Sequence, residues 1–300
     1  MKAAQFSRFG GPEVLEIVDL PDPHPGVGEI RIKVRAAGVN ASDWKKRRGL
    51  MDQELPQTLG YEAAGVVDEI GNNVSGVAVG DRVFGASPYG AAQAELAVLS
   101  YWAPIPDTLD YARCAAIPAA AETAARSLDQ LGVTVGSTVL INGASGSVGS
   151  AAVQLAVERG ARVIGTASSG MHDTLRSLGA EPVAYGDGMP ERVRAIVPSG
   201  VDYALDVAGS SVLPELVKLT GAPEHVITVA DFLGAQETGV RFSRGDTGRA
   251  TYALAQVARM AETGRFTIKV GRTFPLAEVA QAHRVSEAGI VRGKLVLLVD

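Results

Sequence analysis

The sequence predicts an α/β protein with two parts, a barrel-like β module followed by a doubly wound parallel-sheet domain. Short β-type runs separated by turn residues occupy the chain before about residue 120. From residue 138 onward, strand patterns alternate with helix patterns, which is typical of a parallel sheet. The chain has 300 residues, of which 46% are hydrophobic, so it is long enough for two domains and needs neither disulfides nor a structural metal to fold.

The first part is expected to consist of short strands. Gly-Gly-Pro at 10–12 and the proline- and glycine-containing segment 21–28 separate them, as turn residues do. Residues 40–45 are expected to form a turn. The four basic residues at 45–48 are interpreted as a solvated helix face rather than a phosphate or nucleic-acid contact, because the chain carries a net charge of −5. The expected strands are Lys2–Phe6, Leu15–Val18, Glu29–Ala36, Gly65–Glu69, Asp81–Phe84 and Ala94–Val98.

The second part begins with a short apolar run, Thr138–Asn142, of the kind that forms a buried strand. Apolar residues at 148, 151, 152, 155 and 156 then lie on one face of a helix that Gly160 ends. Residues 230–248 are expected to be a polar loop. The other expected elements are, in order, Arg162–Thr166 (strand), Met171–Leu178 (helix), Pro182–Tyr185 (strand), Glu191–Ile196 (helix), Tyr203–Val207 (strand), Val212–Leu219 (helix), His225–Val229 (strand), Arg249–Thr263 (helix), Ile268–Phe274 (strand), Leu276–Ala288 (helix) and Lys294–Val299 (strand).

A glycine-rich segment, residues 142–149, connects the first strand of this second part to its first helix. Glycine and other small residues let the backbone approach a pyrophosphate, and the helix N-terminus stabilises the negative charge. The alternative is a tight turn without a ligand, but a long run of strand–helix alternation follows it. We therefore predict that the segment binds a dinucleotide through Ala144, Ser145, Gly146, Ser147 and Val148.

The end of the second strand favours NADPH over NADH. NAD-binding sites place Asp or Glu about 20 residues beyond the glycines, where it binds the ribose 2′-hydroxyl. This chain has Thr-Ala-Ser-Ser-Gly at 166–170, with no acid to repel a 2′-phosphate. The hydroxyls of Ser168 and Ser169 can donate to that phosphate, and His172 and Tyr185 are further candidate donors. Alternatively, the two serines cap the following helix, and the two roles are compatible.

Composition excludes several classes of protein. Cys114 is the only cysteine, so neither an intramolecular disulfide nor a four-cysteine zinc lobe can form. Residues 1–9 lack the apolar run of a signal peptide, and the longest apolar stretch, Ala115–Ala121, is far shorter than a membrane span. We therefore expect a cytoplasmic protein that acts on a small molecule, with neither nucleic acid nor a membrane as its partner.

Several short motifs follow one another along almost the whole chain. They are Gly38–Asp43, Leu59–Gly65, Val79–Val83, Ala116–Pro118 followed by Glu122–Ala124, the Ala144–Gly149 loop, and Gly293–Leu297. In this order they resemble the medium-chain dehydrogenase/reductase superfamily, and specifically its zinc-independent quinone oxidoreductase (zeta-crystallin-like) branch. The resemblance implies a GroES-like β-barrel domain at 1–120, completed by 265–300, and a Rossmann NADP-binding domain at 121–264.

The resemblance also implies that catalytic zinc is absent. Zinc-dependent relatives carry a ligand cysteine where this chain has Asn40 and a ligand histidine where it has Tyr61, and only Glu62 of that set remains. The four histidines are scattered, with no pair at ligand spacing. No metal site is therefore expected.

Without a metal, the resemblance implies hydride transfer from NADPH to a quinone or to an activated C=C bond such as an enone or enoyl group. The carbonyl oxygen then gains negative charge and needs hydrogen-bond donors. The family places Asn40 near the nicotinamide and the substrate. Ser42 matches a proton-relaying hydroxyl of zinc-dependent relatives, and Lys45, which stands where tyrosine is common, or Tyr61 could donate a proton. The alternatives are structural: a turn former at Asn40, a helix cap at Ser42 and a solvated charge at Lys45.

The resemblance adds cofactor contacts from other segments. Thr123 matches a position beside the nicotinamide, and the strand end at Val229 and Ala230 is expected to offer backbone groups to its carboxamide. Phe242 and Ser243 lie in the expected polar loop, which either covers the cleft or is a disordered surface loop.

Two other functions stay open. One is a tailoring enoyl reductase of a polyketide-like or other specialised-metabolite pathway. Asp231 stands where the polyketide enoyl reductases of the family have a lysine, so their acid assignment does not transfer. The other is a non-catalytic NADPH-binding protein. The family also suggests a homodimer, because the last Rossmann strand often pairs across a two-fold axis.

Overall fold

The computed structural model describes residues 1–88, 90–245 and 248–300. The chain divides into two compact units: unit 1 is Met1–Ala119 together with Leu254–Asp300, and unit 2 is Ala120–Ala253. The predicted fold class is confirmed, because unit 1 is a GroES-like β domain and unit 2 holds a parallel Rossmann-like sheet. In the described part of the chain, no helix combines the length and the apolar character that a membrane span requires.

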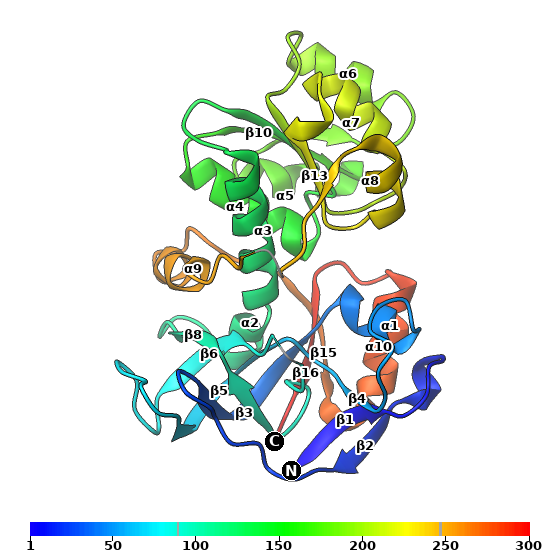
Figure 1. Cartoon of the computed structure of the whole chain (residues 1–300). Helices are drawn as coiled ribbons and strands as arrows, with labels where there is room; N and C mark the ends of the chain where they lie inside the picture. The colour runs from blue at the N-terminus through cyan, green and yellow to red at the C-terminus, as the bar shows by residue number, and fades with distance from the viewer. Residues whose placement is uncertain (89, 246–247) are drawn as a thin grey trace. The chain divides into compact units, whose positions relative to one another are not determined.

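Unit 1 is built on seven strands: β3 (Ile30–Val39), β5 (Glu62–Ile70), β6 (Arg82–Ala86), β7 (Leu96–Leu99), β8 (Tyr101–Pro104), β15 (Val270–Pro275) and β16 (Lys294–Leu298). The strand order is β15-β16-β3-β5-β6-β8, and β7 also pairs with β3. Along one edge, the first half of β3 pairs with β7 and its second half with β16. Figure 1 shows that β16, at the red end of the chain, lies beside the blue β3. The end of β3 is therefore held next to the start of β16.

Smaller elements complete unit 1. A three-stranded sheet has the order β2-β1-β4. Its strands are β1 (Lys2–Phe6), β2 (Glu16–Asp19) and β4 (Gln57–Thr58). The helices are η1 (Pro12–Val14), α1 (Ala41–Arg47), α2 (Tyr111–Ala115), η4 (Leu276–Glu278) and α10 (Val279–Ala288), while α3 (Pro118–Leu131) and α9 (Ala253–Glu262) contain residues of both units.

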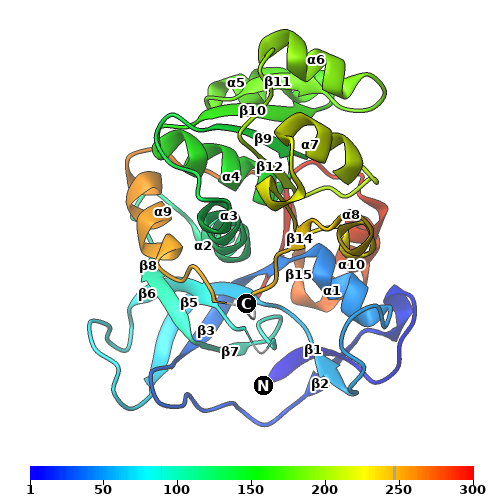
Figure 2. The ribbon, with the colours of Figure 1, turned by 45° about the horizontal axis from the view of Figure 1, so that its top comes forward.

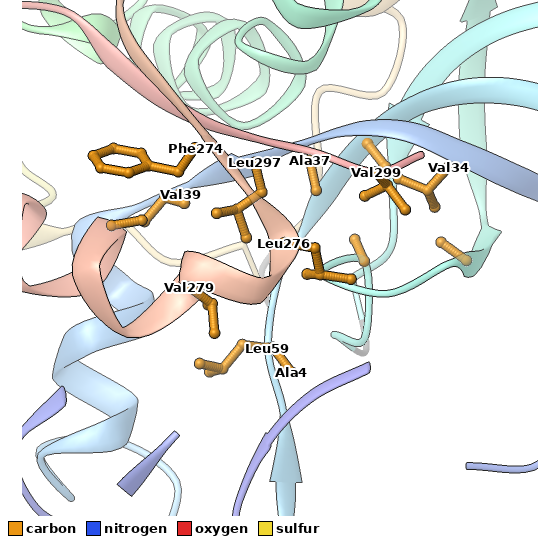
Figure 3. Packing of buried hydrophobic residues seen from close by; sticks show 14 of the residues in the cluster. Ala4, Val34, Ala37, Val39, Leu59, Phe274, Leu276, Val279, Leu297 and Val299 are labelled. Carbon is orange, nitrogen blue, oxygen red and sulfur yellow. The ribbon is translucent and has the colours of Figure 1, made fainter. Parts of the chain in front are cut away.

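The apolar core of unit 1 lies between β3, β16 and α10 (Figure 3). Ile30, Ile32 and Val34 face this core, and after them Ala37 and Val39 do so. Side chains alternate along a strand, so this change from even to odd positions needs one extra residue. The register shift between Val34 and Ala36 supplies it. The core residues labelled in Figure 3 are Ala4, Val34, Ala37, Val39, Leu59, Phe274, Leu276, Val279, Leu297 and Val299.

Unit 2 is built on a six-stranded parallel sheet with the order β11-β10-β9-β12-β13-β14. Its strands are β9 (Thr138–Asn142), β10 (Arg162–Ala167), β11 (Glu181–Ala184), β12 (Tyr203–Asp206), β13 (Val226–Thr228) and β14 (Arg241–Phe242). Its helices are α4 (Ser147–Glu158), η2 (Ser169–Met171), α5 (His172–Ser177), α6 (Met189–Ile196), α7 (Leu213–Thr220), η3 (Pro223–His225) and α8 (Phe232–Thr238).

Helices cover the sheet of unit 2. In Figures 1 and 2, α6 and α7 lie side by side, and both pack with α8 on the face that carries Leu140 and Ile164. Helix α4 packs against β9 and β10 through fully buried small and apolar residues such as Ala152 and Leu155. The predicted strand–helix alternation from residue 138 is confirmed.

The segment 230–248 differs from its prediction as a polar loop. It forms α8 and β14, and β14 adds the sixth strand to the sheet. Asp231 caps α8, because its carboxylate accepts a hydrogen bond from the Gly234 N–H at 2.8 Å, and Gly239 ends the helix with φ +74°. The prediction was wrong because cap and stop residues, rather than apolar periodicity, define this short helix. Residues 246–247 lie outside the described residues.

The expected turn at 40–45 was wrong, because residues 41–47 form α1. The basic run does lie on a helix, as expected, but its face is not fully solvated, because Arg47 is fully buried. The Arg47 guanidinium donates to the Gly10 carbonyl oxygen at 2.5 Å and pairs with the Glu287 carboxylate at 2.6 Å. Helix α1 packs against α10, which brings a partner for this charge that the local sequence does not reveal. Strands β4 and β8 and helix α2 were not predicted.

Candidate functional site

Unit 2 has a cavity of about 550 Å³ at the carboxyl ends of its central strands. The strand order reverses here, because the chain runs from β9 outward to β10 and β11 and returns to β12 on the other side of β9. In open parallel sheets, ligands bind in the crevice at such a reversal. The walls come from the ends of β9 and β10 and from the turns after β11 and β12, and include Asn142, Gly143, Ser145, Thr166, Tyr185 and Ser210.

The loop after β9 has the geometry that a pyrophosphate site requires. Gly143 adopts φ +82°, a left-handed conformation that favours glycine. A Cβ on Gly149 would lie 2.2 Å from the Gly143 carbonyl oxygen, so only glycine lets α4 pack this close to the turn. Helix α4 begins after Gly146, which has no side chain to accept from the first N–H groups. These N–H groups, at the positive end of a 12-residue helix, fit an anion.

The loop residues that were predicted to bind the dinucleotide lie in different environments. Ser145 lines the cavity. Ala144 is fully buried, and its N–H already donates to the Thr166 carbonyl oxygen at 3.0 Å, so it offers a ligand no free donor. Ser147 and Val148 form the first turn of α4, where backbone N–H groups lack helical acceptors.

A row of buried polar side chains crosses four neighbouring strands below this loop. The Thr166 hydroxyl donates to Asn142 Oδ1 at 2.7 Å, and Asn142 Nδ2 donates to Asp206 Oδ1 at 2.9 Å. The Thr228 hydroxyl donates to Asp206 Oδ2 at 2.7 Å. The row therefore links β10, β9, β12 and β13 at their carboxyl ends.

The same row fixes the turns that leave the sheet. Asp206 Oδ1 accepts from the N–H groups of Ala208 and Gly209 at 3.1 and 2.9 Å. Thr228 Oγ1 accepts from the N–H groups of Ala230 and Asp231, each at 3.1 Å. These positioning residues were missed from the sequence, although polar residues near the ends of four buried strands are an unusual pattern that signals them.

The four predicted 2′-phosphate donors are only partly brought together. Tyr185 lines the cavity and is 63% exposed, so its hydroxyl is accessible to a ligand. Ser168 and Ser169 follow β10, and Ser168 stands before η2 without a side-chain capping bond, so its hydroxyl is not committed to the helix. His172 begins α5, and its Nε2 is buried without a hydrogen-bond partner among the described residues.

Charged groups near Tyr185 were also missed. Asp187 and Glu215 line the cavity, and its lining holds neither lysine nor arginine in the described part of the chain. Arg192 lies behind the turn after β11 and donates to four successive carbonyl oxygens, those of residues 184–187, at 2.9 to 3.3 Å. It therefore holds the turn that presents Tyr185 and places a positive charge beside Asp187.

The turn after β12 is strained. Ser210 and Ser211 have φ values of +74° and +54°, which two adjacent non-glycine residues rarely adopt. Both line the cavity. The strain is therefore located at the proposed ligand site, as is common for functional turns.

The residues outside the loop that were predicted to contact the nicotinamide differ in which of their polar groups are already hydrogen-bonded. Thr123 lies half-buried on α3, and its carbonyl oxygen accepts from the Ser127 hydroxyl at 2.8 Å. The N–H groups of Val229 and Ala230 are both used, by the Asp206 carbonyl oxygen and by Thr228. Only their carbonyl oxygens remain available to a carboxamide.

Phe242 and Ser243 are engaged within unit 2. The Ser243 hydroxyl is buried and accepts from the Arg126 guanidinium, which also pairs with Glu122 at 2.8 Å. Phe242 packs edge-on against Phe232, with ring centroids 5.3 Å apart. The side chains of both residues therefore shape the protein rather than extend freely toward a ligand.

Unit 1 holds the predicted catalytic residues around a buried ion pair. Asn40 follows β3, Glu62 begins β5 and Lys294 begins β16. Lys294 Nζ lies 2.5 Å from Glu62 Oε1 and 2.5 Å from Asn40 Oδ1. Asn40 Nδ2 donates to Glu62 Oε1 at 2.9 Å, and the Ala119 N–H donates to Glu62 Oε2 at 2.7 Å. A Cβ on Gly38 would lie 2.3 Å from Glu62 Oε1, so glycine there makes room for the carboxylate.

Asp43 supports this cluster from α1. Its Oδ2 accepts from the Asn40 N–H at 2.8 Å and from Gln93 Nε2 at 3.1 Å. Burial raises the pKa of Asp43 to about 6, against the opposing effects of the Asn40 N–H and the Lys294 charge. Asn40, the residue before α1, therefore has both its backbone and its side chain held by hydrogen bonds.

The other predicted catalytic residues lie nearby along the chain. Tyr61 precedes Glu62, and the Lys46 ammonium lies 4.8 Å from its ring centroid. Burial raises the pKa of Tyr61, so its phenol stays protonated at neutral pH. Ser42 and Lys45 are half-exposed in α1, and the Lys45 ammonium lies 5.9 Å from the Trp44 ring centroid.

The donor set of unit 1 does not fit a zinc ion. Zinc in proteins takes cysteine, histidine and carboxylate ligands, and Glu62 is the one such residue among Asn40, Tyr61 and Glu62. Its carboxylate is already paired with the Lys294 ammonium, which would repel a dication. Cys114 is buried, and burial raises the pKa of its thiol to about 12, so it stays protonated. No group of three potential metal ligands exists among residues 1–88, 90–245 and 248–300.

Known families match both units. The alcohol dehydrogenase GroES-like domain family matches residues 26–103, and the zinc-binding dehydrogenase family matches residues 178–297. Human quinone oxidoreductase is 32% identical over 328 residues, which cover 99% of this chain and 98% of that protein. This chain belongs to the quinone oxidoreductase branch of the medium-chain dehydrogenase/reductase superfamily.

Two further relatives of this family are informative. The spectinabilin polyketide synthase system protein NorB from Streptomyces orinoci is 32% identical over 307 residues, which cover 96% of this chain but only 14% of NorB. The solved structure of a mycobacterial protein complexed with NADPH is 29% identical, covers 99% of this chain and all of that chain, and superposes with a TM-score of 0.82. This chain is therefore similar to proteins with different names and contexts.

Proposed function

We propose that this oxidoreductase is an NADPH-dependent, zinc-independent reductase of quinones or activated C=C bonds. The observation that carries the proposal is the Asn40–Glu62–Lys294 cluster, which supplies hydrogen-bond donors where zinc-dependent relatives bind metal. Bound NADPH supplies the hydride. The chain's own residues then have to hold the cofactor, bind the substrate oxygen and provide a proton.

The cofactor is assigned to the cavity of unit 2. The open N–H groups at the start of α4 bind the pyrophosphate, and Ser145 and Tyr185 bind the remainder of the adenosine side. The absence of an acid at 166–170 and the hydroxyls of Ser168 and Ser169 support NADPH. The mycobacterial relative complexed with NADPH supports it as well. Arg192 holds the turn that presents Tyr185 by donating to its backbone carbonyl oxygens, including that of Asp187.

The substrate oxygen is assigned to Asn40. One N–H of its side-chain amide donates to Glu62, and the other has no acceptor within the described part of the chain. This second N–H stabilises the negative charge that develops on a carbonyl oxygen during reduction. The protonated phenol of Tyr61 is a candidate proton source. Neither role needs a Lewis acid.

The experiment is a turnover assay with a chemically graded panel. NADPH absorbance is followed by stopped flow with 1,4-benzoquinone, 2-cyclohexen-1-one and a crotonyl thioester. We expect turnover with at least one quinone or enone. Tight NADPH binding without turnover across the panel would refute the enzyme and indicate a non-catalytic NADPH-binding protein.

The cofactor assignment has its own test. Ser168→Asp places a carboxylate where the 2′-phosphate is expected, and it should weaken NADPH binding about tenfold relative to NADH, the effect of roughly 1.4 kcal/mol of repulsion. Ser177→Asp, an exposed serine at the end of α5, is the matched control. Equal wild-type affinities for NADPH and NADH would contradict the assignment.

A second candidate is an enoyl reductase of a specialised-metabolite pathway. The similarity to NorB over 96% of this chain favours it. It differs from the first candidate in the acceptor alone, so the crotonyl thioester in the same panel distinguishes the two. Preference for the thioester over both the quinone and the enone would select this candidate.

A further inference from the structure

Lys294 is a buried lysine of the proposed site to which the proposed reaction assigns no individual role. It is 4% exposed, begins β16 and stands in the Gly293–Leu297 motif. Its position is fixed by the sheet, because Leu295 is the register partner of Val39 and the Lys294 N–H donates to the Lys269 carbonyl oxygen at 2.8 Å. A buried ammonium is costly unless it is paired and hydrogen-bonded. The role of the Lys294 charge therefore follows from the groups that the ammonium contacts.

The two groups that contact the Lys294 ammonium are also hydrogen-bonded to each other. Its Nζ contacts Glu62 Oε1 and Asn40 Oδ1, both at 2.5 Å, and Asn40 Nδ2 closes the triangle to Glu62 at 2.9 Å. Glu62 is fully buried. The ammonium and the carboxylate cancel each other's charge. The site therefore contains a positively charged group, although this pair contributes no net charge. Asp43 is the other titratable group that faces Lys294.

This triangle selects one orientation of the Asn40 amide. In the observed orientation the amide oxygen faces the ammonium and the amide nitrogen faces the carboxylate. A flip of the amide would place NH₂ against NH₃⁺ and an oxygen against a carboxylate, which are two repulsive contacts. The ammonium also polarises the amide through Oδ1, which makes the remaining N–H a stronger donor.

We propose that Lys294 is a positioning residue that orients and polarises the Asn40 amide so that its remaining N–H binds the substrate oxygen. This inference rests on the proposed function, because the substrate oxygen is assigned there to Asn40. Lys294 acts through Asn40 and contacts Glu62, and neither its proton nor its charge is consumed.

Two variants separate positioning from simple charge balance. Lys294→Met removes the ammonium but leaves Glu62 as an unpaired buried carboxylate, so it lowers stability as well as activity. The double variant Glu62→Gln/Lys294→Met removes both charges and should recover the melting temperature. It keeps a side-chain oxygen at position 62 that can accept from Asn40 Nδ2, but it still lacks the ammonium that donates to Asn40 Oδ1. Lys33→Met, an exposed lysine on β3, is the matched control.

The kinetic readout is the split between kcat and NADPH binding. Both Lys294 variants should lose about tenfold to a hundredfold in kcat with the best acceptor of the panel, the range expected when an oxyanion donor is misplaced. The Kd for NADPH should stay within about twofold of wild type, since the cofactor is assigned to unit 2. A double variant with wild-type kcat would show that Lys294 only balances Glu62 and would overturn the proposal.

A second readout does not need turnover. With ¹⁵N-labelled asparagine, the side-chain NH₂ signals of Asn40 are assigned by their loss in Asn40→Ala. We expect slow exchange and distinct shifts in wild type and Lys33→Met, and faster exchange with altered shifts in both Lys294 variants. Unchanged Asn40 signals would overturn the positioning role even if the enzyme is active. Absence of wild-type turnover, with the expected NMR change, would refute the proposed function alone.

Discussion

His283 lies fully buried on α10, and neither of its ring nitrogens has a hydrogen-bond partner in the described part of the chain. Burial lowers the pKa of His283 to about 3, and the nearby Arg47 charge acts in the same direction while Glu287 opposes it. Below about pH 6.5 the unfolded chain therefore binds a proton that the folded chain does not. Stability that depends on neutral His283 is present above the unfolded pKa and is lost as the pH falls toward 3.

We expect His283→Leu to protect the protein against acid. Relative to wild type, the free energy of unfolding of this variant should rise by about 1.4 kcal/mol for each pH unit below 6.5. The difference amounts to roughly 2 kcal/mol at pH 5. Urea unfolding at pH 7, 6 and 5 measures this. A pH-independent difference for His283→Leu would contradict the prediction.

Asp43 has the opposite pH dependence. Its folded pKa of about 6 lies above the unfolded value of 3.8, because burial penalises the carboxylate. The folded chain therefore keeps a proton that the unfolded chain loses, and stability falls as the pH rises from 3.8 to 6. Asp43→Asn keeps an oxygen to accept from Asn40 and Gln93. It places NH₂ where Oδ1 has no partner within the described residues.

The free energy of unfolding of the Asp43→Asn variant, relative to wild type, should therefore increase as the pH rises. We expect the difference in unfolding free energy to change by roughly 2.4 kcal/mol between pH 4 and pH 7 in favour of the variant. Chemical unfolding at both pH values, with Asp107→Asn as an exposed carboxylate control, measures this. A variant that loses stability equally at the two pH values would show that Asp43 is ionised throughout.

At the scale of elements, the contact between α4 and the preceding turn depends on Gly149. A Cβ there would lie 2.2 Å from a carbonyl oxygen and 2.7 Å from Ala144 Cα, whereas a Cβ on Gly146 has only the Gly143 carbonyl oxygen at 3.5 Å. Gly149→Ala should therefore push α4 away from β9 and cost about 1–3 kcal/mol of stability. Gly146→Ala is the matched control in the same loop.

The two glycine variants also separate packing from ligand approach. Thermal unfolding without cofactor should show a large loss for Gly149→Ala and a loss of under about 1 kcal/mol for Gly146→Ala, the cost of a poorer N-cap. NADPH titration should show weaker binding for both variants, since a side chain at Gly146 blocks the backbone approach to the pyrophosphate. Normal NADPH affinity in Gly149→Ala would disprove the assignment of this loop.

Whether a feature could be predicted from the sequence depended on how far apart along the chain its interacting residues lie and on how many residues define it. The β9–loop–α4 unit was predictable because its apolar period and glycines act within 20 residues of each other. The helix α8 was missed because one cap and one glycine define its seven residues. Burial of Arg47 was missed because its partner Glu287 lies 240 residues away.

At the scale of the whole molecule, the same limit applies to the candidate site. The sequence pointed to Asn40, Tyr61 and Glu62 because they stand in motifs with known chemistry. It did not reveal that Lys294, 254 residues from Asn40, supplies the cation that contacts both Asn40 and Glu62. That contact exists because β16 returns to pair with β3, which is a property of the sheet topology rather than of any local pattern.

The zinc independence proposed for the enzyme can be tested on the whole protein. A dication would have to displace the Lys294 ammonium from Glu62, and the remaining ligands, Asn40 and Tyr61, are weak donors for zinc. Purified protein should contain far less than one zinc per chain by mass spectrometry. Dialysis against 1,10-phenanthroline should leave both kcat and the melting temperature unchanged. A zinc-dependent alcohol dehydrogenase treated in parallel, which should lose activity, is the control. Stoichiometric zinc whose removal abolishes turnover would mean that Lys294 leaves the cluster in the active enzyme.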